Sequence, residues 1–163
     1  MKKVLIALCL VAVAGMAAYS LWFSATPAPD FTITTLAGQK VDSAGLKGKV
    51  VLVNFWATSC PGCVEEMPQI RQMYQQYGKS GFEVVAVAMN YDNPDYIKAF
   101  VAKNQLPFMV TYDSQGAIAK AFGDIQLTPT TFLIDRSGHI VKSYVGVMNF
   151  AEIRQLIAKS TSM

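Results

Sequence analysis

Two apolar runs, Val50–Trp56, in which Asn54 is the one polar residue, and Val84–Met89, constrain the fold of this chain more than any other feature. A strand with one face in water alternates apolar and polar residues, whereas a strand covered on both faces is apolar throughout. The runs therefore predict strands buried on both sides. The strand-like segments are Asp30–Thr35, Lys49–Trp56, Phe82–Met89, Phe108–Tyr112, Thr130–Ile134 and His139–Val145.

Segments with apolar residues three and four positions apart lie between these strands and predict helices. One helix is expected from Pro61 to about Tyr77, and a second is expected after an Asn93 cap. The apolar stripe of this second helix is Tyr96, Ile97, Phe100 and Val101. A third helix has the stripe Ala117, Ile118, Ala121 and Phe122 and ends at Gly123. The last helix begins at Asn149, with Glu152 three residues on, and has the stripe Phe150, Ile153, Leu156 and Ile157. Strands and helices that alternate, followed by a hairpin and a last helix, predict an α/β fold with a mixed sheet.

The N-terminal segment differs from the rest of the chain. Val4–Phe23 contains no charged residue and follows Lys2 and Lys3. Twenty helical residues span about 30 Å, the thickness of the hydrocarbon core of a bilayer, and the lysines favour a cytoplasmic N-terminus. Small residues within Ala12–Ala18 would also permit cleavage, so a tether formed by residues 4–23 and a signal peptide both remain open.

These features divide the chain into three parts. The predicted parts are an anchor or signal peptide at 1–25, a short linker at 26–29 and a folded domain at 30–163. In either form of the leader we expect the domain to be exported, and therefore to be periplasmic or otherwise extracytoplasmic.

The charge of the domain excludes one class of partner. The chain has 14 basic and 11 acidic residues, and without Lys2 and Lys3 the balance is 12 against 11. A nearly neutral domain without a basic run has no electrostatic reason to bind nucleic acid. We expect no nucleic-acid partner.

The predicted domain contains two cysteines, in the tetrapeptide Cys60-Pro61-Gly62-Cys63. A zinc site needs about four ligands, and His139 is the single histidine of the chain. A structural disulfide is a second reading, although a bridge that closes so small a loop constrains the unfolded chain little. The third reading is a redox-active dithiol.

The position of the pair favours the redox reading. Cys60 would stand at a helix N-terminus, where unpaired backbone N–H groups and the helix dipole stabilise a thiolate. Pro61 is tolerated there because its missing N–H would have had no partner. Cys63, one turn further in, would be shielded yet close enough to attack a mixed disulfide on Cys60.

Four segments together resemble the membrane-tethered thioredoxin-like reductases of the TlpA, ResA and CcmG type. These segments are Ala28–Thr32, Leu46–Lys49, Val53–Pro68 and Thr128–Asp135. The resemblance implies a thioredoxin fold with an added N-terminal β-hairpin and a central β-α insertion near Asn90–Tyr112. It also implies a thiol:disulfide oxidoreductase that reduces protein disulfides, such as the haem-site cysteines of apocytochrome c or those of a metallochaperone. The implied reductant is a membrane thiol-electron transporter, and no cofactor is implied beyond the Cys60–Cys63 disulfide itself.

The same resemblance carries roles to four supporting residues. Thr128 and Pro129 match the cis-proline segment beside the cysteines, against the ordinary expectation of a trans bond. Glu66 matches an active-site glutamate that tunes the thiols or moves protons; a glutamate favoured by the helix dipole is the simpler reading. Trp56 matches a tryptophan packed near the pair, which core packing alone would also explain. Asn54 departs from the buried aspartate of cytoplasmic thioredoxins.

Two other functions compete with this reading. A peroxidase centred on Cys60 would need Pro at 53 and Thr at 57, where the sequence has Val53 and Ala57. A copper-binding assembly module of related fold generally uses Cys-x-x-x-Cys with a distal histidine, for which His139 would be the candidate. The spacing here is two residues rather than three.

Overall fold

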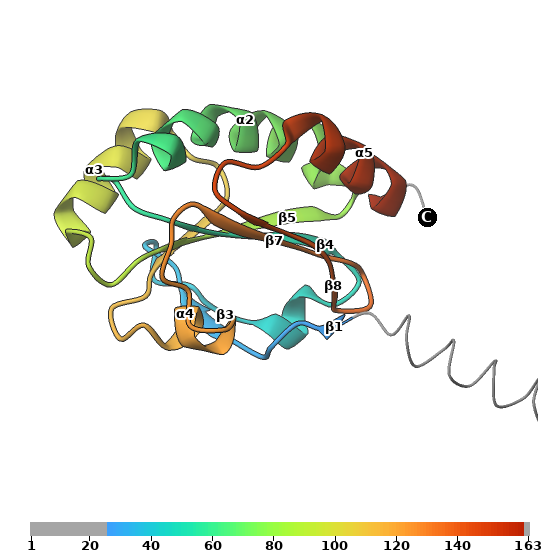
Figure 1. Ribbon diagram of the computed structural model, residues 1–163, viewed down its shortest axis with the longest axis horizontal. Helices are drawn as coiled ribbons and strands as arrows, with labels where there is room; N and C mark the ends of the chain where they lie inside the picture. The colour runs from blue at the N-terminus through green and yellow to red at the C-terminus, as the bar shows by residue number, and fades with distance from the viewer. Residues whose placement is uncertain (1–25, 162–163) are drawn as a thin grey trace, which may run out of the picture.

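The computed structural model of the chain describes residues 26–161 and contains a six-stranded sheet (Figure 1). Its strands, in spatial order, are β1 (Thr26–Pro27), β8 (His139–Val145), β7 (Thr130–Ile134), β4 (Val50–Trp56), β5 (Phe82–Ala88) and β6 (Met109–Tyr112). The strands β4, β5 and β6 are parallel, while β7 is antiparallel to both β4 and β8. The predicted mixed sheet is confirmed.

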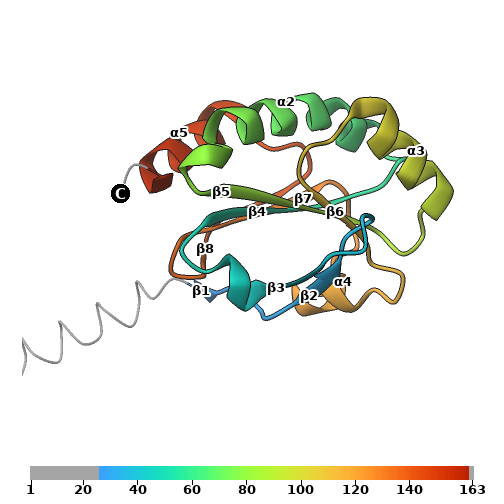
Figure 2. The ribbon, with the colours of Figure 1, turned by 180° about the vertical axis from the view of Figure 1, so that it is seen from behind.

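Helices and a small second sheet cover the two faces (Figures 1 and 2). One face carries the helices α2 (Pro61–Tyr77), α3 (Pro94–Asn104) and α5 (Phe150–Thr161), with the 3₁₀ turn η2 (Gly78–Ser80) after α2. The other face carries the hairpin β2 (Thr32–Thr34) and β3 (Lys40–Asp42), the 3₁₀ turn η1 (Ser43–Leu46) and the helix α4 (Ala117–Ala121). The hairpin and the α3–β6 unit are the predicted N-terminal extension and central insertion of a thioredoxin fold.

The central strand β4 separates two apolar clusters. All seven of its residues are buried, Asn54 included, as the apolar run predicted. Leu52 and Trp56 belong to the cluster under α2, and Val53 and Phe55 belong to the cluster under the hairpin and α4. Successive side chains of a strand point to opposite faces, so one strand supplies both cores.

Three local features differ from the expectations. Thr26 and Pro27, expected in a linker, pair with Ile140 and His139, so the segment runs along the edge of the sheet. The strand-like segments of the sequence did not include β3, the second strand of the hairpin that the resemblance implied, because its three residues include a single apolar side chain, Val41. Tyr96 was expected in the apolar stripe of α3 but is 66% exposed.

The predicted membrane segment, residues 1–25, lies outside the described residues. Within residues 26–161 no helix combines the length and the hydropathy required to cross a bilayer.

Candidate active site

Cys60 stands at the junction between β4 and α2. It is the N-cap of α2, and its Sγ accepts a hydrogen bond of 3.2 Å from the backbone N–H of Cys63. Pro61 opens the helix, where its missing N–H costs nothing. The geometry predicted for the attacking cysteine is therefore present: a sulfur against the N–H groups of a helix N-terminus, where a thiolate is stabilised.

The two cysteines are joined by a disulfide, with their Cα atoms 5.3 Å apart. Cys60 is half-buried, whereas Cys63 has no exposed surface. Trp56, the last residue of β4, belongs to the same apolar cluster as Cys63, and its ring packs on Phe100 at 5.1 Å between centroids. Trp56 and Cys63 thus share one apolar cluster, and core packing by itself accounts for the position of Trp56.

The Thr128–Pro129 peptide bond is cis, as the resemblance implied. A methyl group built on Gly62, between the cysteines, would lie 3.8 Å from Cδ of Pro129 and 3.1 Å from Cγ2 of Val147. Pro129, just before β7, and Val147, just after β8, therefore lie beside the Cys-Pro-Gly-Cys turn, although both are far from it in the sequence.

Glu66 is buried one turn beyond Cys63. Its Oε1 accepts a hydrogen bond of 2.7 Å from Nδ2 of Asn54 on β4. Burial raises the pKa of Glu66 from 4.5 to about 7, against the smaller lowering effects of the Asn54 amide and the Met148 backbone. Residues three apart on a helix share a face, so this carboxyl group and the sulfur of Cys63 lie on the same side of α2. A group with this pKa exchanges protons near neutral pH.

His139 lies at the far end of β8 from the cysteines. Its Nδ1 is 2.8 Å from Oγ of Ser137 in the β7–β8 turn, while Val145 at the other end of β8 pairs with Thr130 beside the cis-proline. Six residues of strand separate the two ends by roughly 20 Å. The structure therefore does not bring His139 to the cysteine pair.

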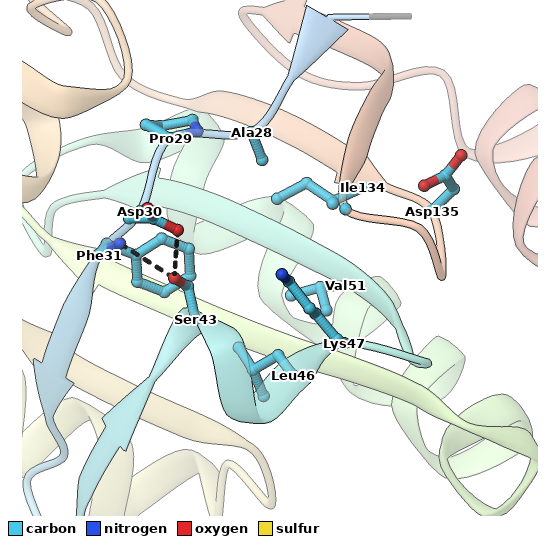
Figure 3. Close-up of a pocket in the computed structure, with 11 residues that line it drawn as sticks. Ala28, Pro29, Asp30, Phe31, Ser43, Leu46, Lys47, Val51, Ile134 and Asp135 are labelled. Carbon is cyan, nitrogen blue, oxygen red and sulfur yellow. Dashed lines mark hydrogen bonds between the residues drawn. The ribbon is translucent and has the colours of Figure 1, made fainter.

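A small cavity of about 60 Å³ lies on the hairpin face (Figure 3). It lies between the segment that leads into β2, the turn η1 and the β7–β8 connection, and Ser43 spans its rim through hydrogen bonds with Asp30 and the Phe31 amide. The space holds a few water molecules at most. Cys60 and Cys63 begin a helix on the other face, so this cavity is separate from them.

Sequence reasoning missed two polar residues that surround the cysteine turn. Asp92 is buried and accepts hydrogen bonds from Thr58, and the phenol of Tyr91 lies 3.0 Å from Oγ1 of Thr128. Both belong to the loop after β5, inside the segment that the resemblance marked as an insertion. Asp-Asn-Pro in this loop indicated a helix start and gave no sign of contact with the residues before Cys60.

Comparison with known proteins agrees with the geometry. Residues 24–157 match the Redoxin family. The thiol-disulfide oxidoreductase ResA of Bacillus cereus is 35% identical over 167 residues, which cover 98% of this chain and 95% of that protein.

Two solved structures extend the comparison to the fold. A thiol:disulfide interchange protein of the thioredoxin family from Chlorobium tepidum matches with a TM-score of 0.77 and 31% identity, covering 85% of this chain and 97% of the other. A secreted disulfide oxidoreductase from Mycobacterium tuberculosis, homologous to DsbE of E. coli, matches with a TM-score of 0.70 and 26% identity, covering 79% and 95%.

Proposed function

Because this chain belongs to the Redoxin family and is a thiol:disulfide oxidoreductase of the ResA type, we propose that Cys60 is its nucleophile and Cys63 its resolving thiol. The Cys60 thiolate attacks one sulfur of a substrate disulfide, which forms a mixed disulfide and releases the other substrate sulfur as a thiolate. The Cys63 thiolate then attacks Sγ of Cys60. This attack releases the second substrate sulfur, so the substrate departs as a dithiol that has gained two electrons. Cys60 and Cys63 have lost those two electrons and are now joined by a disulfide.

The unequal exposure of the two sulfurs carries this assignment. Cys60 is half-buried at the N-terminus of α2, and Cys63 is fully buried one turn inside the helix. A substrate disulfide has to reach the attacking sulfur, whereas the resolving sulfur needs to reach only its neighbour. Exchange rates depend on this access and on the fraction of thiolate, which the helix N-terminus raises for Cys60.

Glu66 serves the second step as a proton acceptor. Cys63 is buried, so its thiol ionises with difficulty unless a base takes the proton. Glu66 shares a face of α2 with Cys63, and its pKa of about 7 lets it accept and return a proton at neutral pH. The carboxyl group of Glu66 thus replaces, as proton acceptor, the buried aspartate that cytoplasmic thioredoxins have at the position of Asn54.

The substrate is a protein segment that lies across an exposed apolar rim. Three large side chains form this rim beside the cysteine turn and the cis-proline: Tyr91, Leu127 and Val147, which are 58%, 65% and 56% exposed. Apolar side chains on a surface mark sites where other proteins bind. Thr128 lies among them and offers its backbone groups to an extended segment, whereas the carbonyl of Pro129 already accepts from the N–H of Gly146 at 2.7 Å.

The physiological direction that fits this family is reduction outside the cytoplasm. The M. tuberculosis relative is secreted, and the uncharged stretch 4–23 would tether this domain to the cytoplasmic membrane. Reducing equivalents then come from a membrane thiol-electron transporter, and the cysteine pair needs no further cofactor. Cysteine pairs of apocytochrome c or of a metallochaperone are the substrates that the family resemblance suggests.

Trapping in cells tests the assignment. Cys63→Ser should accumulate a mixed disulfide between Cys60 and a substrate, visible as a band that disappears on reduction, and Cys60→Ser should not. Accumulation in Cys60→Ser instead would reverse the two roles. Equilibration of the pair with glutathione or dithiothreitol tests the direction: a reduction potential near about −270 mV supports a reductase and one near about −120 mV an oxidant.

A further inference from the structure

Asp92, on the loop after β5, is a buried carboxylate aimed at the residues that precede Cys60. Its Oδ2 accepts a hydrogen bond of 2.6 Å from the backbone N–H of Thr58, and its Oδ1 accepts one of 2.6 Å from the Thr58 hydroxyl. The backbone N–H of Asn93 also donates to Oδ1, at 2.8 Å. Bonds to a charged acceptor are stronger than those between neutral groups, so the two bonds to Thr58 are a firm attachment.

Thr58 belongs to the turn that delivers Cys60 to the helix. The N–H of Cys60 donates to the carbonyl of Ala57 at 3.2 Å, which closes a tight turn between the end of β4 and the start of α2. Ser59 is exposed and Cys60 is half-buried. Asp92 is buried, so its attachment to Thr58 ties this turn to the interior of the domain.

The loop that carries Asp92 is itself anchored. The N–H of Asp92 donates to the carbonyl of Met89 at 3.0 Å, and the N–H of Met89 donates to the carbonyl of Trp56 at 3.0 Å. The Tyr112 hydroxyl donates to the carbonyl of Asn90 at 3.1 Å. A carboxylate held by such a framework can hold another segment in turn.

The start of α3 does not account for Asp92. Asn93 is the N-cap of that helix, and its own side chain accepts from the N–H of Asp95 at 2.8 Å. Placing a carboxylate among apolar residues is costly unless donors satisfy it. Here two of its three donors belong to the cysteine turn.

We propose that Asp92 is a positioning residue for Cys60, an inference that rests on the proposed role of Cys60 as nucleophile. By holding Thr58 it keeps the Sγ of Cys60 against the N-terminus of α2, where the Cys63 N–H donates to it. Without this attachment the turn relaxes, the sulfur loses the helix N–H groups for part of the time, and its thiolate is less favoured. Two other carboxyl groups lie on α2 near the pair, the buried Glu66 and the exposed Glu65.

Alkylation of the reduced full-length protein by iodoacetamide tests the proposal, with fragmentation of the peptides in a mass spectrometer to distinguish Cys60 from Cys9 and Cys63. Asp92→Ala should slow alkylation of Cys60 roughly tenfold at pH 7, because a smaller fraction of the thiol is ionised once the sulfur no longer stays against the helix N-terminus. At pH 10, where the thiol is ionised in either case, the rates should converge. Asp92→Asn keeps an acceptor oxygen for Thr58 and should retain at least about a third of the wild-type rate.

Asp113 provides the matched control. It is another buried aspartate that accepts two backbone hydrogen bonds, from Ile118 and Ala119, but these belong to α4 on the opposite face of the sheet. Asp113→Ala should lower the melting temperature and leave the Cys60 rate unchanged. If Asp92→Ala does not fold, Thr58→Val removes only the hydroxyl bond and must slow Cys60 measurably at pH 7.

The outcomes separate this inference from the proposed function. Slow alkylation of Cys60 in the wild-type protein, no faster than in a free cysteine, contradicts the role of Cys60 itself. A fast wild-type rate that Asp92→Ala leaves unchanged overturns only the role of Asp92. An equal fall of the Cys60 alkylation rate in Asp92→Ala and Asp113→Ala would show general destabilisation and would also overturn the role of Asp92. A fall of that rate that persists at pH 10 would do the same.

Discussion

Asn54 donates from Nδ2 to Oε1 of Glu66 at 2.7 Å, and from the same nitrogen to Oγ1 of Thr131 at 2.9 Å. Because one amide nitrogen serves both acceptors, the orientation of Asn54 is fixed and its Nδ2 faces the glutamate. A neutral donor stabilises a carboxylate less than a cation would. The desolvation of Glu66 is therefore only partly offset, and its pKa stays near 7.

The stability of the oxidised protein should consequently depend on Glu66 between pH 5 and pH 8. Its pKa is about 7 in the folded protein and 4.5 in the unfolded chain, so within this interval the folded state binds more protons and stability falls as pH rises. One pKa unit corresponds to about 1.4 kcal/mol, which makes the total effect roughly 3 kcal/mol at most. Glu66→Gln should remove this dependence of stability on pH. Urea unfolding of the oxidised proteins at pH 5 and at pH 8 measures it.

The neighbouring Glu65 is the control for that measurement, because it is exposed on the same turn of α2. Glu65→Gln should follow the wild-type dependence on pH, while Glu66→Gln gains stability relative to wild type as the pH rises. Parallel curves for all three proteins would mean that Glu66 ionises in the folded state as it does in water.

Asn54→Asp should turn the pair into a coupled dicarboxylate. Two carboxyl groups at hydrogen-bond distance do not both ionise without a large cost, so they share one proton and one pKa of the pair rises. We expect the variant to lose more stability at pH 8 than at pH 5, and an infrared band of a protonated carboxyl group to persist above pH 7. An equal loss of stability at both pH values would contradict the coupling.

Tyr91 should contribute to substrate binding through its ring. Tyr91→Ala removes an exposed aromatic side chain from the rim, and we expect a three- to tenfold rise in KM for a protein disulfide, about 1 kcal/mol, with kcat little changed. Tyr91→Phe removes only the hydroxyl that meets Thr128 and should have a smaller effect. Leu36→Ala, on the hairpin of the opposite face, is the control. A fall in kcat without a change in KM would contradict a binding role.

The sequence predicted those strands and helices whose burial leaves a regular pattern of apolar residues over several consecutive positions. The strand β4 is buried on both faces and therefore apolar at every position except Asn54, and α2 follows it with a cap, a proline and a stripe of core residues. These signals lie within a few residues of one another, so Cys60 and Cys63 could be placed at a strand-to-helix junction before the structure was known.

Contacts between distant segments could not be found in this way. Asp92 and Thr58 are 34 residues apart in the sequence, and no pattern in the residues around either one predicts the hydrogen bond between them. The strand β1 pairs with β8 although two residues, Thr26 and Pro27, have no periodicity to detect. Tyr96 shows the opposite error, because its spacing fits the apolar stripe of α3 while its side chain extends into solvent.

The two apolar clusters should be separable by substitution, and Phe122 is the residue that tests this. It follows α4 on the hairpin face, and its ring packs on Phe31, Phe55 and Phe132 at 5.6, 5.4 and 5.0 Å between centroids. Phe122→Ala leaves a cavity among these rings, and such truncations cost about 3–5 kcal/mol. The free energy of unfolding from urea titration should fall by roughly that amount.

The reactivity of Cys60 should survive this loss, because the sulfur and its helix rest on the other cluster, which contains Trp56 and Cys63. Iodoacetamide alkylation of reduced Phe122→Ala, carried out where the variant is still folded, should proceed within about twofold of the wild-type rate, since the thiolate fraction depends on the helix N-terminus and not on the hairpin face. A tenfold fall in the folded variant would show that β4 transmits a change in one cluster to the cysteine turn.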